Sequence, residues 1–359
     1  MVSRRPIRFP LMALGMAALL AALWGGLLRL GWNWPIMRPA LPAAHGPLMV
    51  SGFLGTLIGL ERAVALGHRW TYFAPVMTGL GALSLIAGAP AAVGAFFMAL
   101  GSLGLAAIFA QLVRRQPALF TVIIGLGALV WLVGNGLWLA GWPIFSVVPW
   151  WAGFLVLTIA GERLELSRFL PISRADQLAF LLAICLFLAG LLIAGVAFDS
   201  GARLSGLGLL ALTLWLLRHD IARRGVQKAG LTRFVAVSLL SGYIWLGVAG
   251  LLWFRLGGVV AGPYYDAVLH AIFLGFVFSM IVGHAPIIFP AVLGTPVPFR
   301  TAFYSHLALL HMSLGLRIVG DLAAWWPGRL WGGLLNVLAV LLFLGNMAVS
   351  VFQGRALSR

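Results

Sequence analysis

Runs of about 20 apolar residues, separated by short polar or Gly- and Pro-containing breaks, make up almost the whole of this 359-residue chain. Hydrophobic residues account for 62% of the sequence and charged residues for only 9%. A helix of about 20 apolar residues crosses the hydrocarbon of a bilayer, and it satisfies its own backbone hydrogen bonds there. The sequence therefore predicts an all-α polytopic membrane protein that is surrounded by lipid and forms a single transmembrane domain over residues 1–359.

The breaks divide the chain into about twelve transmembrane helices in one bundle. The predicted spans are residues 9–31, 45–66, 71–89, 92–113, 118–140, 147–167, 176–197, 203–219, 232–254, 266–290, 301–320 and 328–352. Only Gly88-Ala89-Pro90 separates the third span from the fourth, so eleven or thirteen spans also fit the pattern. The first span is too long for the apolar part of a signal peptide and has no clear cleavage site, so we expect it to be retained.

Basic residues are unevenly distributed between the two sides that this division creates. With the N-terminus in the cytoplasm, 18 of the 24 lysines and arginines fall on the cytoplasmic side. Such an excess is typical of cytoplasmic loops, so we expect a bacterial inner-membrane protein with both termini in the cytoplasm. The net charge of +16 then reflects this bias and attraction to anionic lipid, not nucleic-acid binding. An aromatic belt is expected at the outer boundary from Trp32, Trp34, Trp142, Trp150, Trp151, Trp325 and Trp326.

The single cysteine, Cys185, lies within a predicted span and belongs to no Cys-x-x-Cys-His motif. One cysteine cannot form an intramolecular disulfide, and covalent attachment of c-type haem needs that motif. Iron–sulfur clusters need several thiolates. The sequence therefore excludes these three kinds of site.

Histidines occur in pairs at matching depths of the predicted bundle. His45 and His270 lie near the outer ends of the second and tenth spans, and His284 and His306 lie near the cytoplasmic ends of the tenth and eleventh. In a regular α-helix, 14 residues bring His284 back to nearly the face of His270, about 21 Å further along the axis. Because a histidine within a membrane span usually faces the protein interior and often marks a functional path, the pattern predicts two levels of sites.

Two histidines on separate helices can hold one iron of a non-covalently bound b-type haem, with a neutral imidazole nitrogen as each ligand. The outer pair, His45 and His270, is the candidate ligand set. Haem propionates need cationic partners where the macrocycle meets water. Arg38, Arg255 and Arg317, which fall on the outer side, are the candidates for that role.

The inner pair, His284 and His306, is a candidate for a second metal site. The alternative for these two histidines is an interhelical hydrogen bond or a role in a proton pathway. Copper is a further candidate, because Met49 lies one turn below His45 and a thioether ligand favours Cu(I). The alternative for Met49 is packing.

A weak internal repeat relates the second span to the sixth. Residues 52–62 (GFLGTLIGLER) resemble residues 153–163 (GFLVLTIAGER), and both end in a Glu-Arg pair. The separation of 101 residues fits four spans, so the bundle is expected to contain three four-helix pseudo-repeats. Glu61 and Glu162 are interpreted as members of surface ion pairs, with proton uptake from the cytoplasm as the alternative.

A short motif in the tenth span resembles the signature of the NnrS family. It comprises His270-Ala271, Gly275, Ser279-Met280-Ile281 and Gly283. Further similar segments are Gly242-Tyr243-Ile244-Trp245, Leu316-Arg317-Ile318-Val319, and His45 with Met49 and Gly52-Phe53-Leu54. NnrS proteins are bacterial inner-membrane proteins of about twelve spans that contain haem and copper and are linked to nitric oxide. The resemblance implies the same fold and cofactors for this chain.

The chain departs from the family pattern around His45. The family typically has His-x-His-Glu-Met, whereas this chain has Ala43-Ala44-His45-Gly46-Pro47-Leu48-Met49 and so lacks one histidine and the glutamate. This difference weakens the expectation of copper more than that of haem. The His-Gly-x-x-Met run also resembles the second helix of haem–copper oxidase subunit I. The adjacent histidine pair that a binuclear centre would need is absent from the sequence.

These observations predict a membrane protein that binds haem b and acts in the response to nitric oxide or other nitrogen oxides, or in electron transfer. Its partners would be a small gaseous ligand such as NO and a redox partner. One alternative is a secondary transporter, with discontinuous helices around Asn135, Ser279 and His311. Another is an assembly factor for a respiratory complex that carries no redox cofactor.

Overall fold

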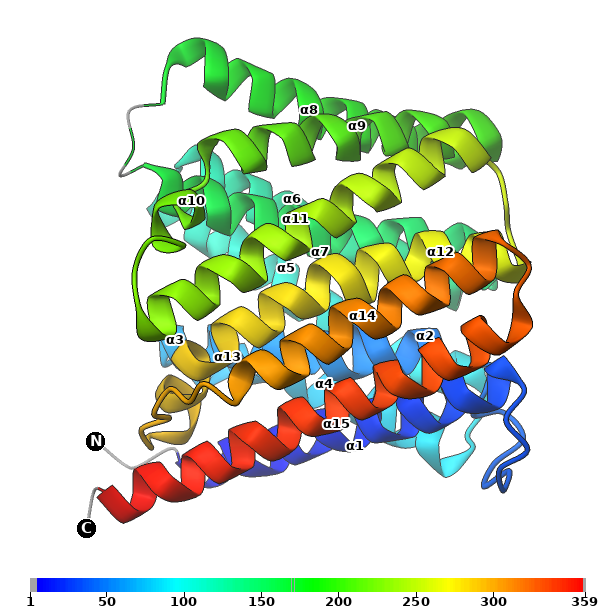
Figure 1. Ribbon diagram of the computed structural model, residues 1–359, viewed down its shortest axis with the longest axis horizontal. Coiled ribbons are helices and arrows are strands. Elements are labelled where there is room, and N and C mark those ends of the chain that lie inside the picture. Colours follow the sequence, from blue (N-terminus) through cyan, green and yellow to red (C-terminus); the bar gives the residue numbers. More distant parts are fainter. Residues whose placement is uncertain (1–4, 169, 171, 358–359) are drawn as a thin grey trace. The chain divides into compact units, whose positions relative to one another are not determined.

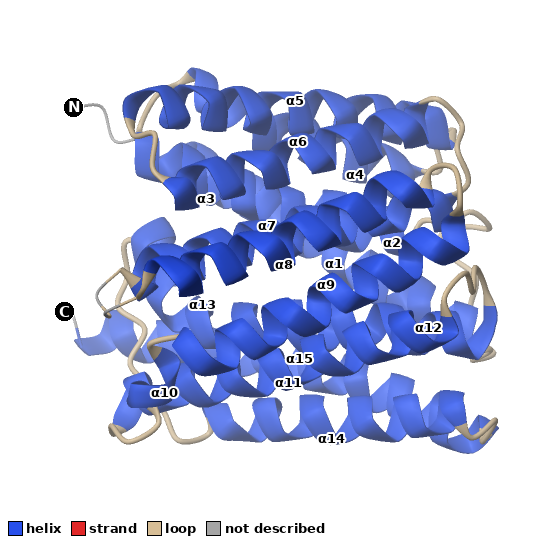
Figure 2. Ribbon diagram, turned by 90° about the horizontal axis from the view of Figure 1, so that it is seen from above, coloured by secondary structure: helices blue, strands red, loops and turns tan. Residues whose placement is uncertain are grey.

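In the computed structural model, which describes residues 5–168, 170 and 172–357, helices form nearly the whole chain and no β-strand occurs in these ranges (Figures 1 and 2). Eleven helical segments of the described part are long and apolar enough to cross a membrane. The protein is thus a multi-pass helical membrane protein, as predicted. Arg4 and Arg359 belong to the 18 basic residues that the sequence places on the cytoplasmic side, and both lie outside the described residues.

The helices divide into two compact units, Met1–Thr158 and Ile159–Arg359. The boundary lies inside one helix, and the prediction of a single domain stays a prediction. Unit 1 comprises α1 (Arg5–Leu30), α2 (His45–Pro47), the π-helix η1 (Leu48–Gly55), α3 (Thr56–Leu66), the 3₁₀-helix η2 (Trp70–Tyr72), α4 (Phe73–Ala87), α5 (Ala91–Arg115), α6 (Leu119–Leu139) and the first part of α7 (Ile144–Ser167).

Unit 2 begins with the last part of α7 and continues to the C-terminal helix. Its other helices are α8 (Arg174–Ala194), α9 (Phe198–His219), α10 (Ala222–Gly225), α11 (Gly230–Leu256), α12 (Gly262–His270), the π-helix η3 (Ala271–Val277), α13 (Phe278–Leu293), α14 (Phe303–Leu322) and α15 (Trp326–Leu357). We call the end at which α9 finishes the Asp220 end, and the end at which α12 begins the Asp266 end.

Glycine, proline and capping residues determine where the helices begin and end. Gly67 and Gly88 end α3 and α4 in the left-handed conformation, with φ of 69° and 88°, which glycine adopts without steric cost. Pro90 directly precedes α5. Ser173 and Asp176 form a capping box at the start of α8, which satisfies backbone N–H groups of its first turn. The predicted spans therefore agree with the observed helices to within a few residues.

The predicted eleventh span forms α14, which is not among the eleven apolar segments. Its 20 residues include His306, His311, Arg317 and Asp321. Three of these side chains are buried in unit 2: His306 and Asp321 are each 1% exposed and Arg317 is 7% exposed. A helix with that many polar groups is stable in a membrane when they face protein, and α14 packs along α15 (Figure 1).

Neutral polar side chains form a hydrogen-bonded cluster inside unit 1. Ser51 donates to Asn135 Oδ1 at 3.1 Å, and Trp131 Nε1 donates to Ser51 Oγ at 3.0 Å. Trp151 Nε1 donates to the same Asn135 oxygen at 2.9 Å, and the Asn135 amide donates to the Met98 carbonyl at 3.2 Å. The cluster joins four helical segments and satisfies each of these groups, as burial requires.

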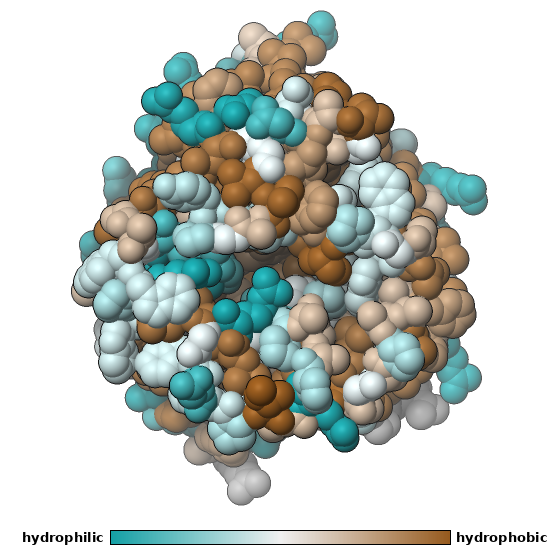
Figure 3. Space-filling model, turned by 90° about the vertical axis from the view of Figure 1, so that its right-hand side faces the viewer, coloured by the Kyte–Doolittle hydropathy of each residue, from teal (hydrophilic) through white to brown (hydrophobic). Residues whose placement is uncertain are grey.

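This cluster corrects one member of the predicted aromatic belt. Trp151 is fully buried, because its indole N–H bonds to Asn135 inside the unit. Trp325 and Trp326 are 48% and 51% exposed at the Asp266 end, and their place in a belt stays a prediction. Figure 3 views the side on which α12 begins, where hydrophilic side chains lie among hydrophobic ones. Such a mixture is expected where helix ends meet the boundary between lipid and water.

Helix α9 packs closely against α8 and α11 in unit 2 (Figure 1). At Gly208 of α9, an added Cβ would lie 2.7 Å from the Cα of Phe187 on α8. Small residues at such positions let membrane helices approach closely. The glycine is therefore needed for this helix contact.

We predict that Gly208→Ala destabilises the purified protein by about 1–3 kcal/mol, because its Cβ would overlap backbone atoms that cannot move aside. Gly345→Ala on α15 is the matched control, since a Cβ added there would meet open space within 4 Å. Loss of folded protein after heating in detergent, followed by size-exclusion chromatography, measures both variants. Equal melting temperatures for the two variants would contradict the prediction.

Candidate functional site

A buried ion pair lies at the Asp220 end of unit 2. Arg163 Nε is 2.7 Å from Asp220 Oδ2, and Arg163 Nη2 donates to Oδ1 at 3.0 Å. The two residues are 3% and 2% exposed. Arg163 belongs to the last turns of α7, and Asp220 follows the last residue of α9. The paired geometry is that of a bidentate guanidinium–carboxylate contact, which is stronger than a single hydrogen bond.

Two further donors complete the surroundings of the Asp220 carboxylate. The Tyr243 hydroxyl of α11 donates to Oδ2 at 2.9 Å, and the Ala222 N–H donates to Oδ1 at 2.7 Å. Removing a charge from water is costly unless partners and hydrogen bonds compensate for it. Four donors therefore hold this carboxylate and connect α7, α9, α10 and α11.

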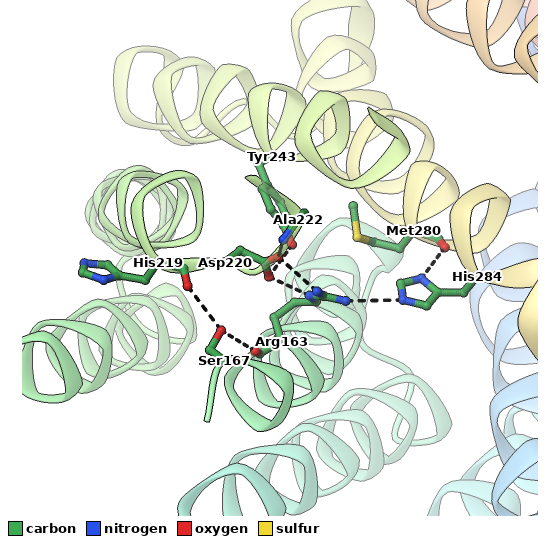
Figure 4. A network of polar contacts seen from close by, with 8 residues as sticks. All are labelled: Arg163, Ser167, His219, Asp220, Ala222, Tyr243, Met280 and His284. Carbon is green, nitrogen blue, oxygen red and sulfur yellow. Dashed lines mark hydrogen bonds and ion pairs between the residues drawn. The ribbon is translucent and has the colours of Figure 1, made fainter. Parts of the chain in front are cut away.

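His284 on α13 extends the same network (Figure 4). Its Nδ1 lies 2.8 Å from the Met280 carbonyl oxygen, and its Nε2 lies 3.4 Å from Arg163 Nη1. Because a carbonyl only accepts hydrogen bonds, Nδ1 carries the ring proton and Nε2 accepts from the arginine. Arg163 thus links a carboxylate at the helix ends to a histidine on a membrane helix.

A second group of charges lies at the Asp266 end. Arg317 on α14 makes a bidentate contact with Asp266 on α12, at 2.8 and 2.9 Å. Asp321 is 1% exposed and pairs with Arg329 at 2.9 Å. The Arg317 side chain therefore bonds to a carboxylate on another helix, and this contact joins α12 to α14.

His270 lies beside this second group. Its Nδ1 is 2.9 Å from the Asp266 carbonyl oxygen and 3.3 Å from Asp266 Oδ1. Both atoms accept hydrogen bonds, so Nδ1 carries the proton and Nε2 is the basic nitrogen of the ring. The arginine that holds Asp266 thereby also fixes the surroundings of His270.

His45 in unit 1 has the same tautomer. Its Nδ1 lies 2.7 Å from the Ala22 carbonyl oxygen of α1. The ring packs on Gly26, where an added Cβ would lie 2.9 Å from two ring atoms. The Gly26 position therefore leaves room for the imidazole, and Nε2 is again the basic nitrogen.

His306 and His311 have the opposite arrangement. The Asn346 amide donates to His306 Nδ1 at 3.0 Å, and the Trp245 indole donates to His311 Nδ1 at 2.9 Å. A neutral ring whose Nδ1 accepts carries its proton on Nε2. His306 also packs against the rings of Phe234, Phe303 and Phe343. These contacts match the interhelical hydrogen bond that the sequence left open for His306.

The π-helix η3 corrects the expectation that His270 and His284 share one face. Residues 271–277 lie between them, and a π-turn contains one more residue than an α-turn. One extra residue rotates everything beyond it by roughly 100°. On either side of this segment, His270 contacts Asp266 and His284 contacts Arg163.

The two arginines predicted to contact haem propionates, other than Arg317, are exposed. Arg38 lies exposed in the segment between α1 and α2, and Arg255 lies exposed in the last turn of α11. His45 belongs to unit 1 and His270 to unit 2, and their pairing stays a prediction. Within the described ranges, no three or more His, Cys, Asp or Glu side chains are grouped so that they could hold a metal ion.

Sequence reasoning missed Asp220 and Tyr243 as members of a site. It interpreted Arg163 as one half of a Glu-Arg pair at a helix end, whereas the structure buries it against Asp220. A usable signal was present: the chain has only 8 acidic residues among 359. An aspartate that directly follows a membrane span is therefore a candidate for an ion pair. Local spacing does not identify its partner, because Arg163 lies 57 residues away in the sequence.

We predict that Asp220→Asn lowers the stability of the protein by about 3–5 kcal/mol, because it leaves the Arg163 charge buried without its counter-ion. The double variant Arg163→Met/Asp220→Asn should recover part of this loss, since it removes the isolated charge. Asp199→Asn is the control, because Asp199 pairs with Arg203 on an exposed surface. Thermal unfolding in detergent compares the variants, and equal losses for the two aspartates would contradict the prediction.

Comparison with known proteins gives one match. The model of a family described as a domain of unknown function, DUF8744, matches residues 8–352. No curated protein and no solved structure matches the chain. Because the family model covers nearly the whole sequence, the chain belongs to the DUF8744 family.

Proposed function

We propose that this protein binds at least one b-type haem through His45 and His270, and that it acts in the response to nitrogen oxides or in electron transfer. The observation that carries the proposal is the tautomer of the two histidines. Each donates its Nδ1 proton toward a backbone carbonyl, from Ala22 and Asp266 respectively. In both rings Nε2 is therefore the nitrogen with the lone pair that a metal needs.

The surroundings of His270 resemble those of metal-binding histidines in general. Such histidines donate their second ring nitrogen to a carbonyl or carboxylate, which fixes the ring orientation and raises its basicity. Asp266 offers both kinds of oxygen to His270 Nδ1. Arg317 in turn holds the Asp266 carboxylate with two hydrogen bonds. The donor chemistry of these residues thus fits a histidine that would hold the haem iron.

A π-helix follows closely after each of the two histidines. In unit 1, η1 begins at Leu48, three residues after His45, and in unit 2, η3 begins at Ala271, the residue after His270. π-helical turns are rare and occur frequently at functional sites. These are the two π-helices of the described chain, and their presence at both predicted ligands supports a common role.

The cationic candidates divide into two kinds. Arg317 is already paired with Asp266, so its proposed contribution is to position the carboxylate behind His270. Arg38, exposed between α1 and α2, and Arg255, exposed in the last turn of α11, are proposed as partners for propionate groups. A bound haem would supply a redox-active iron, and a gas such as NO would bind that iron in place of one of the two histidines. Copper is retained only as an additional candidate, since the sequence lacks one histidine of the related motif.

Absorbance of the full-length protein, purified from haem-supplemented cells, tests the proposal. We expect a Soret band with the wild type and loss or displacement of that band in His45→Ala and in His270→Ala, because each removes one iron ligand. His68→Ala is the control, since His68 is exposed in a loop. A wild-type preparation without a Soret band, and without iron by metal analysis, would overturn the proposal in favour of a transporter or an assembly factor.

We also propose that the protein lies in the bacterial inner membrane with both termini in the cytoplasm. The excess of basic residues in alternate loops supports this orientation. At the Asp220 end of unit 2, the connections carry Arg218, Arg223, Arg224 and Lys228, whereas the connection between α8 and α9 at the Asp266 end carries no basic residue.

Reporter fusions test the orientation. Green fluorescent protein fused to the C-terminus is expected to fluoresce, and alkaline phosphatase at that position to be inactive, because the C-terminus would face the reducing cytoplasm. The matched control is the same pair of reporters after residue 141, beyond α6, which should give the reverse result. The opposite pattern at both positions would invert the proposed topology.

A further inference from the structure

A pocket of about 410 Å³ opens at the Asp220 end of unit 2. Its volume lies within the range of about 300–1,000 Å³ that is common for small-ligand sites. The lining residues lie before α8, at and just after the end of α9, and in and just after α10. They are Leu170, Ile172, Arg218, His219, Asp220, Arg223, Arg224 and Gln227.

The charge of this pocket is positive. Arg218, Arg223 and Arg224 supply three guanidinium groups, and Asp220 is the carboxylate among the lining residues. Asp220 already accepts hydrogen bonds from Arg163, Tyr243 and the Ala222 N–H. These buried partners already compensate the Asp220 charge. The carboxylate therefore does not neutralise the three arginines that line the pocket.

One of the arginines is held in place by the backbone. Arg223 Nη1 donates to the Arg218 carbonyl oxygen at 2.7 Å, and this contact uses one of the five donors of a guanidinium. His219 is held on the other side by a 3.5 Å contact with Asp176. Two of the lining side chains, Arg223 and His219, are therefore each held by a contact within the protein.

We propose that this pocket binds a phosphate-bearing anion, the chemistry shared by anionic phospholipid headgroups and free phosphate esters. Guanidinium groups match phosphate oxygens in charge and in bidentate geometry. Basic pockets between membrane helices are known to take up phosphorylated headgroups at the membrane surface. The inference does not rest on haem, because none of the predicted haem-binding residues lines the pocket.

The test measures stabilisation of the full-length protein in detergent by added ligands. Phosphatidylglycerol is compared with phosphatidylcholine, which has a phosphate but no net charge, and with soluble glycerol 3-phosphate. A ligand that binds only the folded state raises its melting temperature. We expect a saturable rise with phosphatidylglycerol and an affinity at least about tenfold lower for Arg223→Gln/Arg224→Gln.

The control is Arg114→Gln/Arg115→Gln, which removes the same net charge from an exposed arginine pair at the end of α5 that does not line the pocket. It should keep wild-type affinity, and the melting temperature without ligand verifies that each variant is folded. A matching saturable rise with glycerol 3-phosphate would assign the site to free phosphate esters, and a response to phosphatidylglycerol alone would assign it to lipid. No saturable response, or equal losses in the two double variants, would overturn the proposal.

Discussion

The low polarity of a membrane interior requires every buried charge to have a partner, and this requirement organises the second half of the molecule. All five aspartates of the chain lie between residues 176 and 321. Each contacts a basic side chain: Asp176 with His219, Asp199 with Arg203, Asp220 with Arg163, Asp266 with Arg317, and Asp321 with Arg329. The two bidentate contacts between helices, at Asp220 and Asp266, lie at opposite ends of unit 2, and each has a histidine beside it.

In unit 1 the described helix interiors bury neutral polar side chains that hydrogen-bond to one another, without such bidentate ion pairs. Asn135 receives two hydrogen bonds and donates one, and Thr56 donates to Thr78 at 2.9 Å. Trp131 stacks on Phe154 at a centroid distance of 4.5 Å and fills the space beside Gly55. Neutral hydrogen bonds require less desolvation than charges do. The two units therefore use different chemistry to bury polar side chains.

The sequence predicted the helices well because one local property, the length of an apolar run, determines where a membrane helix lies. Even α14 was found, although His306 and Arg317 make it too polar for a hydropathy criterion. The contacts of the site were not predicted, because Arg163 and Asp220 are brought together by folding over 57 residues. A regular α-helical period also did not predict how His270 and His284 are oriented relative to each other. The π-helix between them adds a residue to the turn, and the amino-acid pattern does not reveal it.

The separation of Arg163 from Asp220 along the chain has a consequence for how the protein is made. At a synthesis rate of 5–20 residues per second, Asp220 is added roughly 3 to 11 s after Arg163, which it follows by 57 residues. Until then the arginine has no carboxylate partner, and it stays solvated because it lies in the last turns of α7, near the water boundary. The contact can form only after α8 and α9 have been synthesised. Burial of the Arg163 charge therefore depends on a carboxylate that two later helices separate from it.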